Sequence, residues 1–166
     1  ISKAPADAKS SSNATAPAAA VRAEAEDVPA TAPAKLDSSP AGGTRSLSVP
    51  PEAEGKLDLV TLIFNYHDLG HMGVDRAAMN KAVFKALKSG GVYVIADHAG
   101  RPGTGISEAG TLHRIEEAFL RREVEAAGFK LAAEGTFLRN PNHPRDKNTP
   151  DPPQPKDEFV LKFVKP

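Results

Sequence analysis

Two apolar stretches of this chain end in side chains that could carry out acid–base chemistry. The stretches read "LDLVTLIFNYHD" and "VYVIADH", and their polar ends are Asn65, Tyr66, His67, Asp68, Asp97 and His98. An imidazole titrates near neutral pH, so His67 or His98 could act as a base toward a bound molecule. Each group also has a structural role open to it, because an aspartate can cap a turn and a histidine can be hydrogen-bonded where a strand ends.

The spacing of the histidines in "HDLGH" allows a second interpretation, a metal site. His67 and His71 stand four residues apart, and on a helix they would share one face, as the histidines of zinc-binding helices do. The neighbouring His67 and Asp68 also resemble metal hydrolases of the HD type. Gly70 and Gly73 disfavour a helix here, and no third ligand stands at a suitable spacing. We therefore assign no metal ligand and rank this alternative last.

The residues around these groups predict two parallel strands joined by a helix. "LDLVTLIFNY" is apolar and nearly continuous, which is typical of a strand covered on both faces. Asp75 can cap the helix that follows, and "SGG" ends it. The apolar stripe of that helix consists of Ala78, Met79, Ala82, Val83, Ala86 and Leu87. Because "VYVIADHA" is a second strand, the unit should have a right-handed crossover.

If the two strands are neighbours, their carboxyl ends meet at one edge of the sheet. Ligands bind at such edges in open parallel sheets. The sequence therefore predicts that the six polar residues of "NYHD" and "ADH" share one binding edge. This convergence is the main functional signal of the sequence.

The remainder of the chain predicts one more helix and two more strands. The helix starts near Thr111 and ends at Gly128. Its buried stripe consists of Leu112, Ile115, Phe119 and Val124. "FKLAAEGTFL" and "DEFVLKFV" follow as strands. Residues 139–157 form a long Pro-rich connection between them, and loops of that length are either functional or mobile.

Composition divides the chain into two parts. No aromatic residue precedes Phe64, and residues 1–55 are mostly Ala, Pro, Ser and Thr with scattered charge. Such a segment buries too little apolar surface to offset its ordering entropy, so we predict a low-complexity tail or linker before one ordered region, 56–166. A net charge of zero favours neither nucleic acid nor a membrane as partner, and the lack of cysteine excludes disulfides. The N-terminal segment suits either a cytoplasmic tail or a linker behind a removed export signal.

Several motifs occur in an order that is familiar from one family. They are "GKLDLVTLIFNYHDL", "ALKSGGVYVIADHA", "LHRIEEAFLRREVEAAGFKL" and "DEFVLKFVKP". Together they resemble the C-terminal half of class I S-adenosylmethionine-dependent methyltransferases, and most closely a bacterial group of predicted methyltransferases. Asp58 matches the aspartate that begins the family's fourth strand, and Ser89 stands where proline is usual. The resemblance covers about residues 55–166. It implies an α/β, partial Rossmann-like methyltransferase sheet: two parallel strands with a crossover helix, then a helix and an antiparallel closing hairpin.

The resemblance also implies a cofactor, S-adenosylmethionine, and a small-molecule methyl acceptor. Asn65 and Tyr66 would lie by the cofactor, His67 or His98 would be the base, and the residues facing the acceptor would be Asp68, Asp97, His113 and Arg114. In this family a glycine-rich turn in the first half of the fold holds the cofactor, and nothing before residue 55 matches it. Whether the chain is an enzyme therefore depends on whether the first half of the fold is supplied from elsewhere.

The alternative is a non-catalytic interaction protein. Without the first three strands of the fold, the strand "LVTLIFNY" would have a free edge. Open apolar strand edges pair readily with other chains. On this interpretation we expect a homodimer or a complex with a complementing chain.

Overall fold

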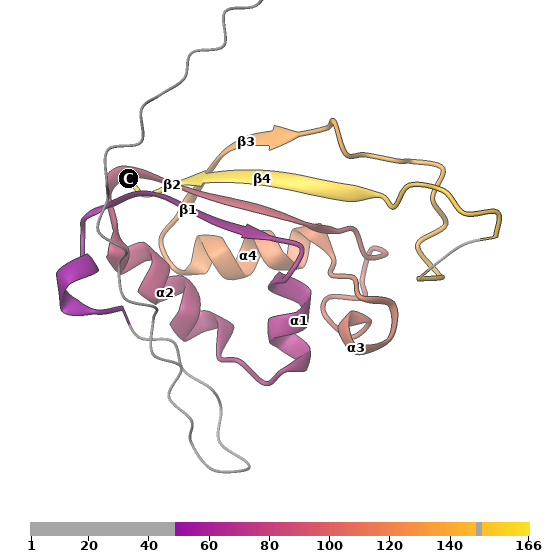
Figure 1. Cartoon of the computed structure of the whole chain (residues 1–166), viewed down its shortest axis with the longest axis horizontal. Helices are drawn as coiled ribbons and strands as arrows, with labels where there is room; N and C mark the ends of the chain where they lie inside the picture. Colours follow the sequence, from indigo (N-terminus) through magenta and orange to yellow (C-terminus); the bar gives the residue numbers. More distant parts are fainter. Residues whose placement is uncertain (1–48, 149–150) are drawn as a thin grey trace, which may run out of the picture. The chain divides into compact units, whose positions relative to one another are not determined.

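The computed structural model describes residues 49–148 and 151–166. Nearly all of the predicted tail lies outside these ranges, so the prediction for residues 1–55 stays a prediction. The elements along the chain (Figure 1) are a 3-10 helix Pro51–Ala53, β1 Leu57–Ile63, α1 Tyr66–His71, α2 Arg76–Ala86, β2 Leu87–His98, α3 Ala109–Leu112, α4 Glu117–Ala126, β3 Lys130–Gly135 and β4 Glu158–Val164. Within the described ranges, no helix has the length and apolar character needed to cross a membrane.

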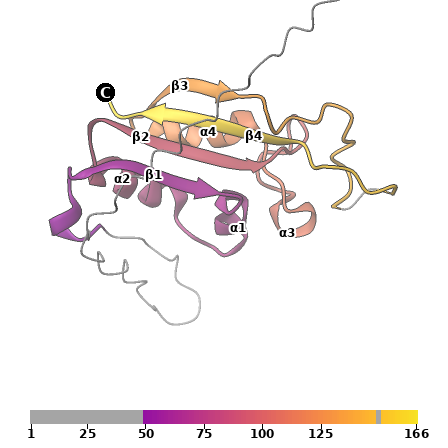
Figure 2. The same cartoon turned by 45° about the horizontal axis from the view of Figure 1, so that its top comes forward.

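The four strands form one mixed sheet in the order β1-β2-β4-β3 (Figure 2). β1 and β2 are parallel and are connected through α2, as the sequence predicted. β4 lies between β2 and β3 and runs antiparallel to both. The predicted fold class, a partial Rossmann-like sheet with an antiparallel closing hairpin, is confirmed.

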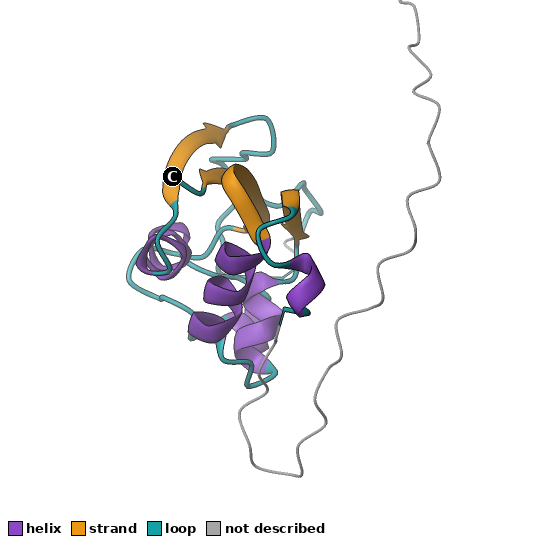
Figure 3. Ribbon diagram, turned by 90° about the vertical axis from the view of Figure 1, so that its left-hand side faces the viewer, coloured by secondary structure: helices purple, strands orange, loops and turns teal. Residues whose placement is uncertain are grey.

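The helices cover one face of this sheet (Figures 1 and 3). The side chains that point toward them from β2 and β4 are fully or almost fully buried: Tyr93, Ile95, Phe159, Leu161 and Phe163. Met79 of α2 and Leu120 and Val124 of α4 complete the same core. The position of the crossover helix therefore decides which side of the sheet becomes the core.

The opposite face of the sheet, which we call the open face, is only partly covered. The strand register shows which side chains lie next to one another on this face: Leu59 pairs with Val92, and Thr61 pairs with Val94. Leu59 is 56% exposed and Ile63 is 44% exposed. The prediction that β1 is covered on both faces is wrong for the described part of the chain. The physical reason is that the described helices pack against one face of the sheet only.

Two predicted helix boundaries also differ from the structure. α2 is capped by Asp75, which accepts a hydrogen bond from the Ala78 amide as expected, but it ends at Ala86. Leu87 is not the last apolar residue of the helix, because its backbone is extended and it pairs with Leu57 at the start of β2. An apolar residue at helical spacing can belong to the end of a helix or to the start of the next strand. For Leu87, pairing with β1 places it in the strand.

The helix expected from Thr111 to Gly128 is divided in two. α3 ends at Leu112, the next residue His113 has a left-handed φ of 52°, and α4 begins at Glu117. Between them Ile115 forms a bridge with Ala99 beyond the end of β2. The backbone hydrogen bonds of this bridge replace those of a continuous helix.

We predict that adjacent residues of β4 have unequal effects on stability. Leu161 is fully buried, so Leu161→Ala should lower the free energy of unfolding by about 2–5 kcal/mol, measured by urea denaturation. Lys162 points to the open face, and Lys162→Ala should change it by less than about 0.5 kcal/mol. Equal losses in the two variants would mean that the open face is also covered in solution.

Candidate functional site

The centre of the candidate site is a buried carboxylate at the end of β2. Asp97 is fully buried and its two oxygens accept three hydrogen bonds. Two come from His67, whose backbone amide lies 2.9 Å from Oδ2 and whose ring Nδ1 lies 2.6 Å from Oδ1. The third comes from the backbone amide of His98, at 2.8 Å. Asp97 therefore holds the first turn of α1 against the end of β2, and the predicted shared edge forms.

The same contacts set the orientation of the His67 ring. A carboxylate only accepts hydrogen bonds, so Nδ1 of His67 is the donor in this pair. The other ring nitrogen, Nε2, faces away from Asp97 and lies 3.2 Å from Oδ1 of Asp68. His67 is 2% exposed, whereas the side chain of Asp68 is 35% exposed. A base held in this way would exchange protons with its surroundings past Asp68.

A third side chain reaches this group from a distant part of the sequence. Nδ1 of His113 lies 3.4 Å from the same oxygen of Asp68, and its ring meets the ring of His67 edge to face at a centroid distance of 5.7 Å. The left-handed backbone of His113 makes the chain turn there. His67, Asp68 and His113 are the described residues whose ligating atoms are close enough together to hold a metal ion.

A sharp turn places α1 beside Asp97. Phe64 has a φ of 56°, which is unfavourable for a bulky side chain, and its amide donates to the carbonyl of Ala96. The Phe64 ring stacks on the ring of His98 at a centroid distance of 5.0 Å. Directly after this turn, residues 66–71 form α1. Gly70 and Gly73 were expected to disfavour a helix here, and this expectation is wrong for residues 66–71, because the contacts of α1 with Asp97 outweigh the low helix propensity of Gly70.

The second predicted base, His98, is in a different environment. Burial and the nearby charge of Lys156 together lower the pKa of His98 to about 4, although the carboxylate of Asp97 opposes this shift. Its Nδ1 lies 2.9 Å from Oε1 of Glu158, whose own pKa is raised by burial. The imidazole of His98 is therefore neutral at neutral pH and is a weaker base than an ordinary histidine.

The two residues predicted to contact a cofactor have separate positions. Asn65 is exposed at the start of α1 and its side chain makes no capping hydrogen bond. Tyr66 is fully buried: its hydroxyl donates to Glu123 at 3.0 Å and accepts from the amide of Asn80 at 2.7 Å. Burial raises the pKa of Tyr66. Its position favours a core role, and only Asn65 offers an exposed side chain for a ligand.

Arg114, predicted to face the acceptor, is also fully buried. Its guanidinium donates to the carbonyl of Ala99 at 3.0 Å and lies 3.4 Å from Nε2 of His143 and from the carbonyl of Lys147. Burial lowers the pKa of Arg114, and Asp157 opposes that shift. The side chain thus connects the end of β2 to the long loop between β3 and β4.

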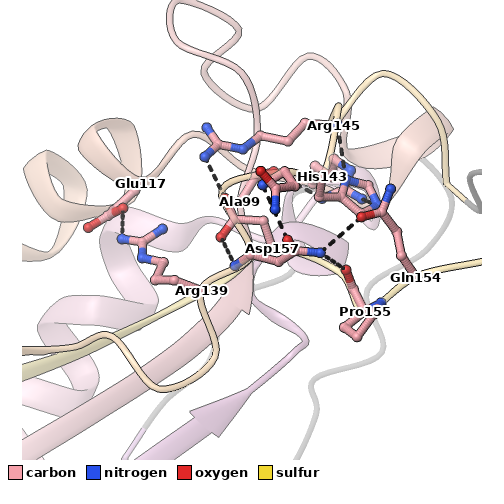
Figure 4. A network of polar contacts seen from close by, with 11 residues as sticks. Ala99, Glu117, Arg139, His143, Arg145, Gln154, Pro155 and Asp157 are labelled. Carbon is pink, nitrogen blue, oxygen red and sulfur yellow. Dashed lines mark hydrogen bonds and ion pairs between the residues drawn. The ribbon is translucent and has the colours of Figure 1, made fainter.

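That loop borders a cleft of about 580 Å³ which the sequence analysis did not identify. Figure 4 shows the polar contacts that order the loop: Arg145 reaches Asp157 at 2.5 Å, and the backbone amide of Asn140 donates to the same carboxylate. Arg139 forms an ion pair with Glu117 of α4. The only sequence signal for these residues is a Pro-rich loop with alternating charges, which does not specify their partners.

We predict that His98 titrates far below an unfolded histidine. Its pKa of about 4 lies below the ordinary value, so the unfolded chain binds the proton first as pH falls from about 6.5. Stability should therefore decrease between about pH 6.5 and 4. Denaturation across this range should show a weaker decrease for His98→Gln, which cannot titrate. Parallel curves for the two proteins would contradict the burial of His98, and an NMR titration would give its pKa directly.

We also predict that Arg114 stabilises the loop. Arg114→Lys cannot maintain the fork of contacts to Ala99 and Lys147, and should cost about 1–3 kcal/mol in the free energy of unfolding. Arg121→Lys, at an exposed ion pair on α4, should cost less than about 1 kcal/mol. Limited proteolysis should then cut residues 136–148 faster in Arg114→Lys only. Equal cleavage in both variants would contradict this role.

Comparison with known proteins gives matches in structure only. No family model matches the sequence, and no curated protein does either. One similar solved structure is a methyltransferase in complex with the Trm112 activator of Haloferax volcanii. The two sequences are 16% identical, the match covers 72% of this chain and 58% of that chain, and the TM-score is 0.48.

Two further similar structures are S-adenosylmethionine-dependent methyltransferases. The one from Thermotoga maritima has 14% identity, with 71% of this chain and 60% of that chain covered and a TM-score of 0.47. The one from Mesorhizobium loti has 14% identity, with 72% and 65% covered and a TM-score of 0.45. The chain thus spans less than two thirds of the length of each of these three proteins, and the likeness concerns the fold alone.

Proposed function

We propose that this chain forms the C-terminal half of an S-adenosylmethionine-dependent methyltransferase unit that acts on a small molecule. The observation that supports it best is the buried Asp97–His67 pair where β1 and β2, two parallel strands, end side by side. Ligands bind at such ends in open sheets, and a histidine held by a carboxylate is suited to take a proton there.

The described residues supply only one side of a cofactor site. Asn65 is exposed near the end of β1, but Tyr66 has no exposed atom. β1 pairs with β2 alone among the described strands, so no neighbouring strand carries a glycine-rich turn toward it. These residues do not fit a complete cofactor by themselves. The proposal therefore requires further chain, from a longer polypeptide or from another protein, beside β1.

The chain's own contribution to the reaction would be the handling of the acceptor proton. Nε2 of His67 is free of Asp97 and faces Asp68 and His113, which are partly exposed. An acceptor proton would reach His67 past these two groups. Asp97 keeps the ring in one orientation, so this pair is where we place the base. His98, with its lowered pKa, is the weaker candidate.

Titration calorimetry tests whether the isolated chain contributes to cofactor binding. We expect weak, saturable binding of S-adenosylmethionine, in the millimolar range because half of the site is missing. Asn65→Ala should weaken it further, since this side chain is exposed and makes no capping contact. Asn142→Ala, at an exposed asparagine in the loop, is the matched control. The absence of heat at high protein concentration would exclude cofactor binding by the isolated chain.

A specific observation also favours the second candidate, an interaction module. β1 has one strand partner among the described residues and carries Leu59 and Ile63, both strongly exposed, on the open face. Such an edge can add a strand from another chain, with backbone hydrogen bonds and apolar contacts together. A second copy of this chain or a complementing polypeptide could use it.

We predict self-association through β1, measured by multi-angle light scattering. Leu59→Lys combined with Ile63→Lys should shift the chain toward monomer, because charge at a strand edge opposes pairing. Met72→Lys is the control, since Met72 is 52% exposed but lies outside the sheet. A monomeric wild-type protein at high concentration, or an equal effect of Met72→Lys, would count against this edge as an interface.

A further inference from the structure

We infer that His67, Asp68 and His113 form a binding site for one divalent transition-metal ion, with Zn²⁺ as the best fit. Their ligating atoms all lie within 4.8 Å of one another. The inference needs only these described residues and does not rest on methyl transfer. It differs from the "HDLGH" interpretation, because the third group comes from the bend between α3 and α4 and not from the same helix.

The distances between the ligand atoms match a tetrahedral site. Zinc binds imidazole nitrogen and carboxylate oxygen at about 2.0–2.1 Å, which places neighbouring tetrahedral ligands about 3.3–3.4 Å apart. Oδ1 of Asp68 lies 3.2 Å from Nε2 of His67 and 3.4 Å from Nδ1 of His113. Two edges of the tetrahedron are therefore already present. The third edge, between the two imidazoles, is no longer than 4.8 Å.

Asp97 prepares His67 for this role. Metal-binding histidines usually donate their second ring N–H to a carboxylate or carbonyl, which fixes the tautomer and strengthens the bond to the ion. His67 makes this contact through Nδ1, at 2.6 Å from a fully buried carboxylate, and its Nε2 faces Asp68. Asp97 is therefore a positioning residue for the site and not a ligand.

Charge and exposure also suit a bound ion. A divalent cation would be balanced by the two carboxylates nearby, Asp68 as ligand and Asp97 behind His67. The side chain of His113 is 48% exposed, so the ion has access from solvent. With three protein ligands, the fourth position would be left to water, as in reactive zinc sites. Two imidazoles favour zinc over magnesium or calcium, which prefer oxygen.

His71 provides the contrast that identifies the ligand set. It stands four residues after His67 in α1 but is not part of the group. Its ring lies against α3, where a Cβ atom on Gly110 would approach His71 Nδ1 to 2.6 Å. The absence of a side chain at Gly110 is what lets these two short helices approach. His71 thus packs against α3 while His113 completes the site.

Bound metal would change what His67 can do. The ion would use the Nε2 lone pair, which is the position that accepts a proton in the proposed function. Metal loading and proton acceptance by His67 would therefore exclude each other.

The test is equilibrium dialysis of the untagged 166-residue chain against Zn²⁺ alone, followed by elemental analysis. We expect one ion per chain. His113→Ala should abolish this stoichiometric binding, while His71→Ala should leave it unchanged. Asp97→Asn should weaken it by about 10- to 100-fold, as expected for a group that orients a ligand. Circular dichroism of each variant checks that the fold is intact, and His113 is exposed enough to be replaced safely.

Three outcomes would overturn the inference. Wild-type chain without bound zinc would exclude the site. Binding that persists in both His113→Ala and His71→Ala would show an adventitious ion only. If His71→Ala loses zinc binding while His113→Ala retains it, the ion would be bound by His67 and His71 of α1 instead. None of these measurements contains S-adenosylmethionine, so a lack of zinc binding would leave the proposed function unaffected. Calorimetry with the cofactor in the presence of a metal chelator tests that function separately.

Discussion

The interaction on which the rest of the site depends is the buried carboxylate of Asp97. Its three hydrogen bonds connect the end of β2 to the first turn of α1 and fix the ring of His67. A buried charge without partners would be strongly destabilising, so this region can fold only with α1 in place. That requirement explains why a segment containing Gly70 is helical and why the chain accepts an unfavourable backbone conformation at Phe64.

A second constraint comes from the one-sided covering of the sheet. The helices bury one face, and the core is built from the facing rows of β2 and β4. The open face retains valines on its inner strands and exposed Leu59 and Ile63 on β1. Apolar side chains in this arrangement indicate a surface that gains stability from being covered. The methyltransferase and interaction hypotheses both require a partner beside β1, and they differ in whether that partner carries the cofactor.

The chemistry of the site depends on what occupies the space between His67 and Asp68. When no ion is bound there, Nε2 of His67 could accept the proton of a methyl acceptor, as the proposed function requires. A metal ion there makes the same nitrogen a ligand and recruits His113. Both roles use one oriented imidazole, since Asp97 fixes the tautomer in either case. Tyr66 and Arg114, by contrast, stabilise the core and the loop, although their sequence positions beside His67 and His113 suggested contact with ligands.

The family resemblance implied the antiparallel closing strand. The sequence by itself determined the parallel strand pair, the crossover helix and the meeting of "NYHD" with "ADH". These follow from local patterns of apolar residues and from the geometry of parallel sheets. Only the tertiary structure decided which polar residues face inward, that α1 is helical, and that His113 joins His67 and Asp68. The reason is that these outcomes depend on contacts between residues 30 and 45 positions apart, where burial and hydrogen bonding outweigh local propensity.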